Sequence, residues 1–253
     1  MSDTSNTVVT AAFLIIGNEI LSGRTKDLNL NVLATALVEK GIRMREARVV
    51  ADDEDEIVGA VQALSKRYDH VFTSGGIGPT HDDITCDCIA KAFGRPVIRN
   101  PGALRLLQVH YERSGIELNE ARLRMANTPE GATLIDNPVS AAPGFTIENV
   151  HVMAGVPRIF EAMVKELLPR LVGGAPVRSI SISCPLGEGI VAAGLGAIQA
   201  EHPDLEVGSY PYFRAGKIGT TLVARGSDDA DLEAAAEKIR ALIRQNGGEP
   251  IEV

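Results

Sequence analysis

The chain has 253 residues, of which 45% are hydrophobic and 23% charged, a composition typical of a globular protein. Its formal net charge is −8 and no run of five basic residues occurs, so a broad electrostatic grip on nucleic acid is not expected. No apolar run reaches the ~18 residues that a membrane-spanning helix needs, so a membrane partner is not expected either. Because no basic residue precedes the first apolar stretch, a signal peptide is not predicted and we expect a cytoplasmic protein.

The three cysteines, Cys86, Cys88 and Cys184, form neither a disulfide framework nor a zinc pattern. Two of them are spaced i,i+2, and on a helix this spacing does not place them on one face. We interpret all three as small buried or half-buried thiols in a reducing compartment.

The first part of the chain alternates between short apolar strands and amphipathic helices. A polar tail leads into a β-branched, near-continuous apolar run that ends at Gly17, which is typical of a strand buried on both faces. The elements expected after it are a helix that ends before Gly41, a strand over residues 42–50, a helix that carries Ile57 and Leu64 on its inner face, and a strand over residues 70–76. This order favours a parallel sheet with covering helices, the α/β class.

The middle of the chain is predicted to be more helical, and a second, smaller domain follows it. Residues 101–115 and 117–127 have the pattern of two consecutive helices, and short strands and a further helix follow. The stretch "VGGAP" (residues 172–176) is the best linker candidate, so the predicted domains are residues 1–172 and 177–253. The second is expected to be a small α+β domain whose two middle strands are joined by a glycine turn.

The stretch "TSGGIGPTHDD" (residues 73–83) lies between a predicted strand and a predicted helix. Glycine-rich backbone in this place brings N–H groups close to an anion, and the start of the helix adds partial positive charge. We therefore predict a phosphate site at Gly75, Gly76 and Gly78. The neighbouring ligand contacts are expected from Ser74, Pro79 and Thr80, with Thr73 as a further hydroxyl donor. If this loop is exposed, a branched side chain at Gly76 is expected to weaken ligand binding much more than it weakens the fold.

Two aspartates follow these glycines, and carboxylates repel a phosphate unless a divalent metal lies between them. Mg²⁺ is typically held by one or two carboxylates together with phosphate oxygens, so Asp82 and Asp83 indicate a metal–phosphate site. The alternative is that either aspartate only caps the following helix. The spacing matches neither the Walker A loop nor the dinucleotide fingerprint. His81 is interpreted as a structural residue.

Three other segments are expected to reach the same crevice, because they also follow predicted strands. Asn18 and Glu19 come directly after Gly17, and Asp52 ends a third strand, where it could instead be a simple helix cap. The turn "AGVP", with Gly155 and Pro157, completes this set of candidate ligand-binding residues.

Taken together and in this order, "IIGNEILSG", "GGIGPTHDDIT", "APGF" and "AGVP" resemble the molybdopterin-binding domain family. Within it the chain is similar to CinA-type proteins (competence/damage-inducible protein A) and to the N-terminal domain of eukaryotic FAD synthases. The resemblance covers residues 8–172, and more weakly the tail, which resembles the KH-like second domain of CinA proteins. Many relatives have glycine where Ser140 stands and proline where Ala154 stands.

The resemblance implies a three-layer α/β/α sandwich with a mostly parallel sheet, followed by a small KH-like α+β domain. It also implies a crevice for a nucleotide or pterin, a divalent metal (Mg, Mn or Co) on Asp83 and Asp52, and a homodimer. CinA-type members are associated with ADP-ribose pyrophosphatase activity, and the FAD synthase relatives with FAD hydrolysis. The deamidase domain of full-length CinA proteins has no counterpart in these residues, so that activity is not expected.

Three hypotheses about function follow. The first is a metal-dependent pyrophosphatase, with Asp83, Asp82 and Asp52 as catalytic carboxylates and the glycine amides and Thr80 stabilising the diphosphate. The second is molybdopterin adenylyl transfer, and the third is a nucleotide or pterin sensor without catalysis.

Overall fold

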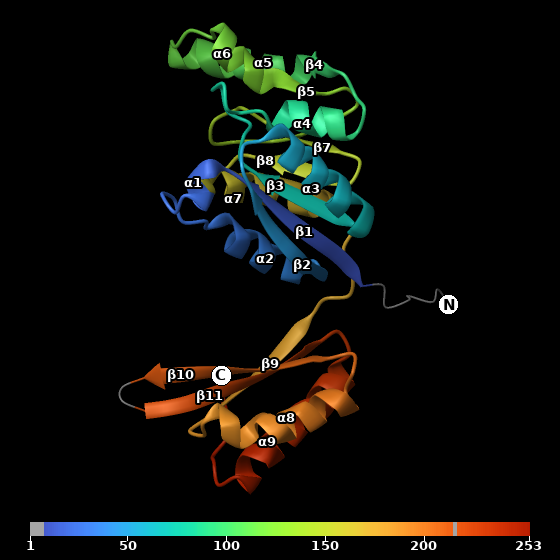
Figure 1. The fold of residues 1–253 in the computed structure, drawn as a ribbon, viewed down its shortest axis with the longest axis vertical. Helices are drawn as coiled ribbons and strands as arrows, with labels where there is room; N and C mark the ends of the chain where they lie inside the picture. Colours follow the sequence, from blue (N-terminus) through green and yellow to red (C-terminus); the bar gives the residue numbers. More distant parts are fainter. Residues whose placement is uncertain (1–7, 215–216) are drawn as a thin grey trace, which may run out of the picture. The chain divides into compact units, whose positions relative to one another are not determined.

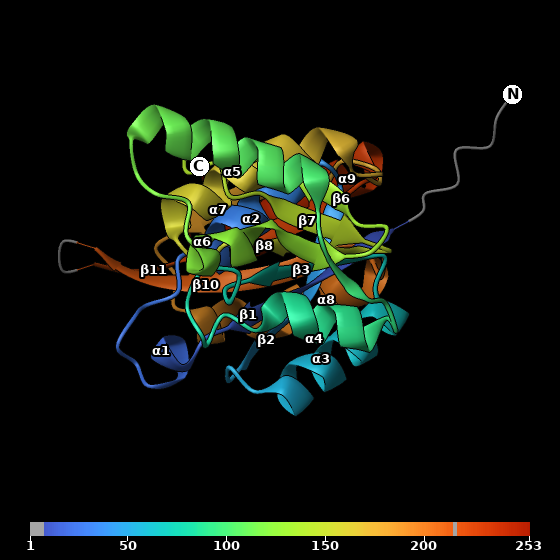
Figure 2. The ribbon, with the colours of Figure 1, turned by 90° about the horizontal axis from the view of Figure 1, so that it is seen from above.

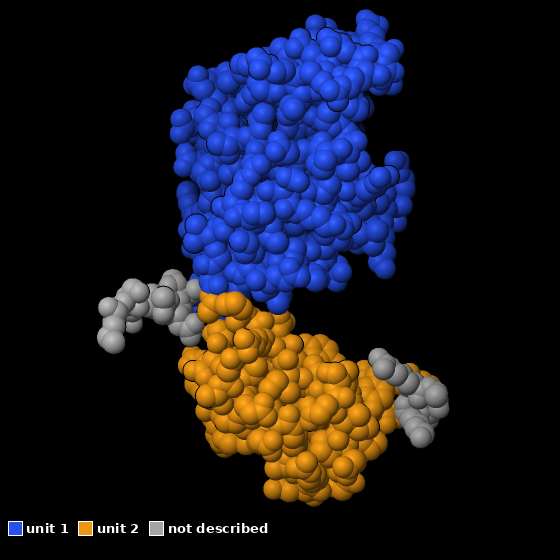
Figure 3. All heavy atoms as spheres, turned by 180° about the vertical axis from the view of Figure 1, so that it is seen from behind, with its two compact units in different colours: residues 1–174 blue, residues 175–253 orange. Residues whose placement is uncertain are grey.

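A computed structural model of the chain describes residues 8–214 and 217–253. The predicted polar tail and the predicted glycine turn between the last two long strands lie outside the described residues. The chain forms two compact units, residues 1–174 and 175–253 (Figure 3). Within the described ranges, no helix has both the length and the apolarity needed to cross a bilayer.

The first unit is built on a six-stranded sheet with the order β2-β1-β3-β8-β7-β6 (Figure 1). The strands β2, β1, β3 and β8 run parallel, whereas β7 and β6 are added in antiparallel pairs. The mostly parallel sheet predicted from the sequence is therefore confirmed. In chain order the strands are β1 (Val9–Ile16), β2 (Ile42–Val50), β3 (His70–Ser74), β6 (Thr133–Ile135), β7 (Gly144–Ile147) and β8 (Val150–Met153).

Helices cover both faces of this sheet, as expected for a three-layer sandwich. Figure 2 shows α3 (Glu54–Arg67) and α4 (Thr85–Ala92) on one side and α2 (Asn29–Glu39) and α7 (Pro157–Leu167) on the other. Successive side chains of a strand point to opposite faces, so β1 contributes to both cores. Leu14 packs in the cluster with α3 and α4, and Phe13 packs in the cluster with α2 and α7. Burial on both faces explains the unbroken apolar sequence of β1.

A smaller layer, inserted between α4 and β6, differs from the prediction. The helix α5 (Pro101–Ser114) forms as expected, but the second predicted helix is reduced to α6 (Glu120–Leu123) and the 3₁₀ turn η1 (Arg124–Ala126). The chain then extends into β5 (Asn127–Pro129), which pairs with β4 (Val97–Arg99). Proline disfavours helical geometry in the residue before it, so Pro129 together with this strand pairing accounts for the early end of the helix.

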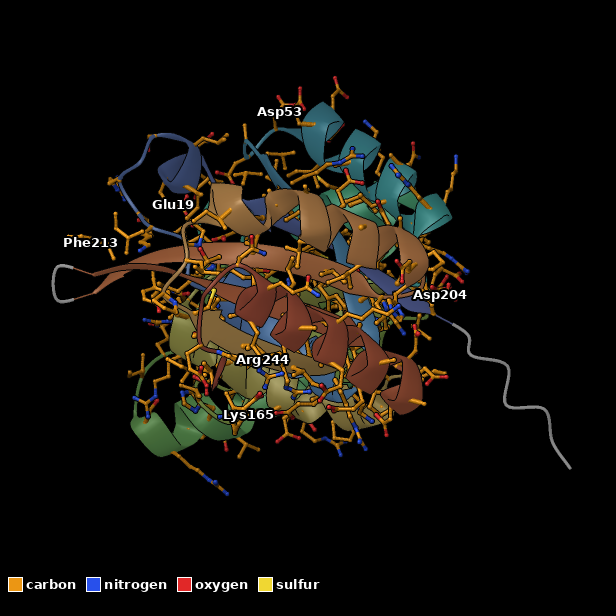
Figure 4. All side chains as sticks on the ribbon, turned by 90° about the horizontal axis from the view of Figure 1, so that it is seen from below. Glu19, Asp53, Lys165, Asp204, Phe213 and Arg244 are labelled. Atoms are coloured by element: carbon orange, nitrogen blue, oxygen red, sulfur yellow. The ribbon has the colours of Figure 1, made fainter. Side chains whose placement is uncertain are left out.

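The second unit is the small α+β domain that the sequence predicts. Its elements are β9 (Arg178–Cys184), α8 (Glu188–Glu201), β10 (Glu206–Arg214), β11 (Lys217–Gly226), α9 (Asp229–Gln245) and β12 (Ile251–Glu252). Because the order in its antiparallel sheet is β10-β11-β9-β12, the chain follows a split βαβ path. Cross-strand partners Phe213 and Ile218 are 72% and 66% exposed on the long hairpin of this unit (Figure 4).

The first unit ends in a segment that is hydrogen-bonded back onto it, beyond the 3₁₀ turn η2 (Leu168–Arg170). The His70 ring nitrogen Nε2 lies 3.1 Å from the Val172 carbonyl oxygen. The amide of Gly174 donates to the Lys40 carbonyl oxygen over 3.1 Å. A side chain at Gly173 would meet that same oxygen at 2.2 Å, so the segment packs closely against β2 and α2. The residues up to Gly174 therefore belong with the first unit.

A fragment of residues 1–174 is expected to fold alone, with a cooperative calorimetric transition. A fragment of residues 1–171 should be about 1–3 kcal/mol less stable, because it lacks these two hydrogen bonds. Denaturant unfolding of both fragments and of the full chain measures this difference. A molten 1–174 fragment beside an ordered full chain would show that the two units are one cooperative block.

Candidate functional site

The candidate site lies at the carboxyl edge of the parallel strands, between β1 and β3. From β1 the chain enters α2 on one face of the sheet, and from β3 it enters α4 on the opposite face. Such a reversal leaves a crevice between the two loops, and ligands of doubly wound α/β proteins bind there. The order 2-1-3 of neighbouring strands thus brings together the two loops that the sequence singles out, residues 17–23 and 75–83.

The glycine loop is tightly packed at its base. Gly75 and Gly76 have φ angles of 109° and 67°, a backbone region that other residues rarely adopt. A Cβ atom on Gly75 would lie 2.1 Å from the Ile16 carbonyl oxygen of β1. The Gly75 amide donates to the carbonyl oxygen of Met153, the last residue of β8, over 3.1 Å. The backbone of the loop is therefore packed between β1 and β8.

Beyond this base, backbone donors are left free. The amides of Gly76, Ile77 and Gly78 have no hydrogen-bond acceptor among the described residues, and all three residues are half-buried. Successive N–H groups beside a left-handed residue form a concave anion site. The predicted glycine cradle thus has the donors that a phosphate needs.

Asp83 does not cap α4, so the capping alternative is wrong for both aspartates. The helix starts after Ile84, and no side chain caps it. Asp83 Oδ2 instead accepts hydrogen bonds from the Thr80 amide and hydroxyl, over 2.8 and 2.5 Å. The Thr80 hydroxyl is therefore occupied with orienting Asp83 rather than free to donate to a diphosphate. Asp82 is exposed beside it.

Asp52 is likewise not a helix cap. The cap of α3 is Asp53, which accepts from the amides of Asp55 and Glu56 and stands at the start of the helix (Figure 4). Asp52 Oδ2 accepts from the Asn18 amide over 2.8 Å, which ties the end of β2 to the loop after β1. The Glu19 carboxylate folds back over Gly17, where a Cβ atom would meet it at 2.7 Å.

A buried amide side chain joins three of the loops. Asn29, at the start of α2, donates to Ser74 Oγ over 2.7 Å and to the Gly155 carbonyl oxygen over 2.8 Å. Ser74 is 2% exposed and Thr73 is fully buried, so these hydroxyls lie behind the glycine loop. The expected ligand contact of Thr73 is therefore wrong, and Ser74 acts as a support in this structure. Pro157 is the first residue of α7, where its missing N–H costs no hydrogen bond.

A recess runs from the glycine loop toward the inserted layer. One wall consists of the glycine loop and the start of α4, namely Gly76–Gly78, Asp83, Cys86 and Asp87. The other wall consists of residues in η1, at the start of β5 and in or just before β7, namely Arg124, Met125, Asn127, Pro143 and Phe145. Sequence reasoning missed Arg124 because no motif surrounds it. Burial, and secondly the Asp87 carboxylate, raise the pKa of the Cys86 thiol to about 12, so this cysteine is not a thiolate nucleophile at neutral pH.

The carboxylates of the crevice are too few to hold a hard divalent cation without further ligands from a phosphate or from water. No group of three or more His, Cys, Asp or Glu side chains within residues 8–214 and 217–253 is placed to hold a metal. In Asp83 and in Asp52, Oδ2 accepts a hydrogen bond from the protein. The other carboxylate oxygen, Oδ1, has no hydrogen-bond donor among the described residues. Mg²⁺ commonly takes one or two carboxylates and completes its shell with phosphate oxygens and water, and the donor set fits that mode.

Comparison with known proteins identifies the family. Residues 12–172 match the probable molybdopterin binding domain, and residues 176–249 match the FAD synthase middle domain. The chain therefore belongs to the molybdopterin-binding domain family, and its resemblance to CinA-type proteins is confirmed.

Individual relatives agree with this assignment. A protein of Metallosphaera sedula is 32% identical over 94% of this chain and 96% of its own length. A CinA-like protein of Geobacter metallireducens is 33% identical, with 94% of this chain and 59% of the relative covered. The crystal structure of the protein CinA from Thermoplasma acidophilum is 35% identical over 64% of this chain and 98% of that one, with a TM-score of 0.59.

Gly76 is packed closely against the Thr85 side chain, so its substitution affects the stability of the fold. A Cβ atom there would lie 2.1 Å from Thr85 Oγ1, a buried hydroxyl that donates to the Gly75 carbonyl oxygen. A side chain at Gly76 should therefore damage the fold as well as the site, because the loop is half-buried and not exposed.

We expect Gly76→Ala to lower the free energy of unfolding clearly more than Gly94→Ala. Gly94 has a similar φ of 62° but open space around its missing side chain, so its substitution isolates the backbone strain of about 1–2 kcal/mol. Urea unfolding of the two variants measures the difference. If both variants lose the same free energy of unfolding, the Thr85 side chain moves aside without a cost in stability, and the loop is not rigidly packed.

Proposed function

We propose that the crevice between β1 and β3 binds a nucleotide diphosphate derivative of the ADP-ribose or FAD type. Metal-dependent cleavage of its diphosphate would then release AMP. One observation carries the proposal: the acceptor-free amides of Gly76, Ile77 and Gly78 lie beside the Asp83 carboxylate at the switch point of the sheet. Donors alone suit any anion, but donors next to a carboxylate suit an anion that brings a cation with it.

Each residue group has a distinct role in this proposal. The three amides hold the negative charge of the diphosphate, which grows on its oxygens during cleavage. Asp83, oriented by Thr80, and Asp52, oriented by Asn18, are the carboxylates that would hold a divalent metal. A bound divalent cation supplies charge neutralisation at the phosphoryl oxygens and lowers the pKa of a water molecule.

The reaction balances as a hydrolysis. The oxygen of one water molecule bonds to phosphorus, the bridging P–O bond breaks, and the two protons of the water end on the products or in solvent. The exposed Asp82 is the candidate to accept the first of these protons. The products are AMP and the phosphorylated second half of the substrate.

A second function is favoured by the description of the family, which names molybdopterin. The same amides could hold the terminal phosphate of a pterin, and the same carboxylates could serve adenylyl transfer. Assays with ADP-ribose, FAD, NAD and CoA in the presence of Mg²⁺, Mn²⁺ or Co²⁺ separate the two. Pyrophosphatase activity releases AMP from one of these compounds in water, whereas a transferase needs a pterin acceptor.

Asp83→Asn should abolish metal-dependent AMP release, by at least about 100-fold, with a melting temperature within a few degrees of wild type. Asparagine keeps an oxygen that accepts from Thr80, but it lacks the charge that a hard cation requires. The exposed Asp204→Asn in the second unit is the matched control and should leave the rate unchanged. Full activity of a folded Asp83→Asn protein would exclude Asp83 as a metal ligand.

A further inference from the structure

The recess beside the glycine loop contains a cation without a counter-ion. Arg124 of η1 is half-buried, and its Nη2 donates to the backbone carbonyl oxygen of Asp83 over 3.2 Å. Across the described residues this is its sole hydrogen bond, and none of their carboxylates forms an ion pair with it. A guanidinium group has five N–H donors, so four of them are unused.

Neighbouring arginines of the inserted layer also lack a carboxylate partner among the described residues, but they do not line the recess. Arg122 donates to the Glu117 carbonyl oxygen and lies over the Tyr111 ring, 5.3 Å from its centre. Arg99 donates to the Asn127 side chain. Charged groups withdrawn from water are normally paired, because desolvation otherwise costs several kcal/mol. The open donors of Arg124, which lines the recess, are available to an anionic group that enters it.

The position of Arg124 is fixed from both sides of η1. Asn119 caps α6 just before it by accepting from the Arg122 amide over 3.0 Å. Directly after it, Ala126 is fully buried and its carbonyl oxygen accepts from the Asn100 amide over 2.8 Å. Held in this way, the guanidinium group would lose little freedom on binding a ligand.

We propose that Arg124 binds a phosphate group of the ligand whose diphosphate is held by the amides of Gly76–Gly78. This inference rests on the proposed function and adds a specificity residue to it. The planar guanidinium fork matches two oxygens of one phosphate, which a single amide cannot do. Arg124 lines the same recess as Gly76 and Gly78, so it is the cation that a phosphate held by these amides would meet. Its hydrogen bond to the Asp83 carbonyl oxygen links the bound phosphate to the segment that carries the metal-binding carboxylate.

Calorimetric titrations of the full chain with ADP, AMP and adenosine, at fixed Mg²⁺, test this role. Arg124→Gln should weaken ADP binding at least about tenfold and leave adenosine binding unchanged. Arg124→Lys keeps the charge but not the fork, and it should restore part of the lost affinity. Arg105→Gln removes an exposed positive charge of α5 that lies outside the recess, and it should bind all three compounds as wild type does.

The outcomes separate this inference from the proposed function. If wild type binds ADP through Arg124 but releases no AMP from any diphosphate compound, the pyrophosphatase proposal fails and the role of Arg124 stands. If Arg124→Gln binds ADP as tightly as wild type, or loses adenosine binding equally, Arg124 is only a support for the Asp83 backbone. If wild type does not bind ADP, both proposals are overturned.

Discussion

The close approach of the Gly75 backbone to the ends of β1 and β8 is the contact on which the site depends. The residue has a left-handed φ, donates its amide to Met153, and leaves no room for a Cβ atom beside the Ile16 carbonyl oxygen. The amides of the next three residues have no acceptor among the described residues. Thr85 completes the anchor by donating its hydroxyl to the Gly75 carbonyl oxygen. A side chain at Gly75 or Gly76 would displace the loop and with it the proposed phosphate site.

The recess is lined by charged side chains of both signs. Asp83 and Asp87 contribute negative charge and Arg124 contributes positive charge, yet no ion pair joins Arg124 to either carboxylate in the described part of the chain. A metal ion bound to a diphosphate would meet both requirements, because the cation faces the carboxylates and the phosphates face the amides and the guanidinium group. An uncharged ligand would leave these groups uncompensated.

The parts of the fold that could be predicted are those that local sequence determines. The apolar run of β1 and the glycines at residues 75–78 indicated a buried strand and a phosphate loop, because burial and left-handed φ restrict residue type at each position. Local pattern could not tell that Asp53, rather than Asp52, caps α3, since adjacent aspartates have equal capping propensity. Nor could it reveal Arg124, or that Asn29 at the start of α2 binds Ser74, because these contacts join residues 41 and 45 positions apart in the chain. The second helix of the inserted layer was overestimated because strand pairing overrides helical spacing there.

The most direct test of the account is a crystal structure grown with ADP and Mn²⁺, with the metal located by its anomalous scattering. We expect phosphate oxygens within hydrogen-bond distance of the Gly76, Ile77 and Gly78 amides, and an anomalous peak for manganese next to the Asp83 carboxylate. Well-ordered ADP bound elsewhere on the protein, with these three amides still without an acceptor, would contradict it.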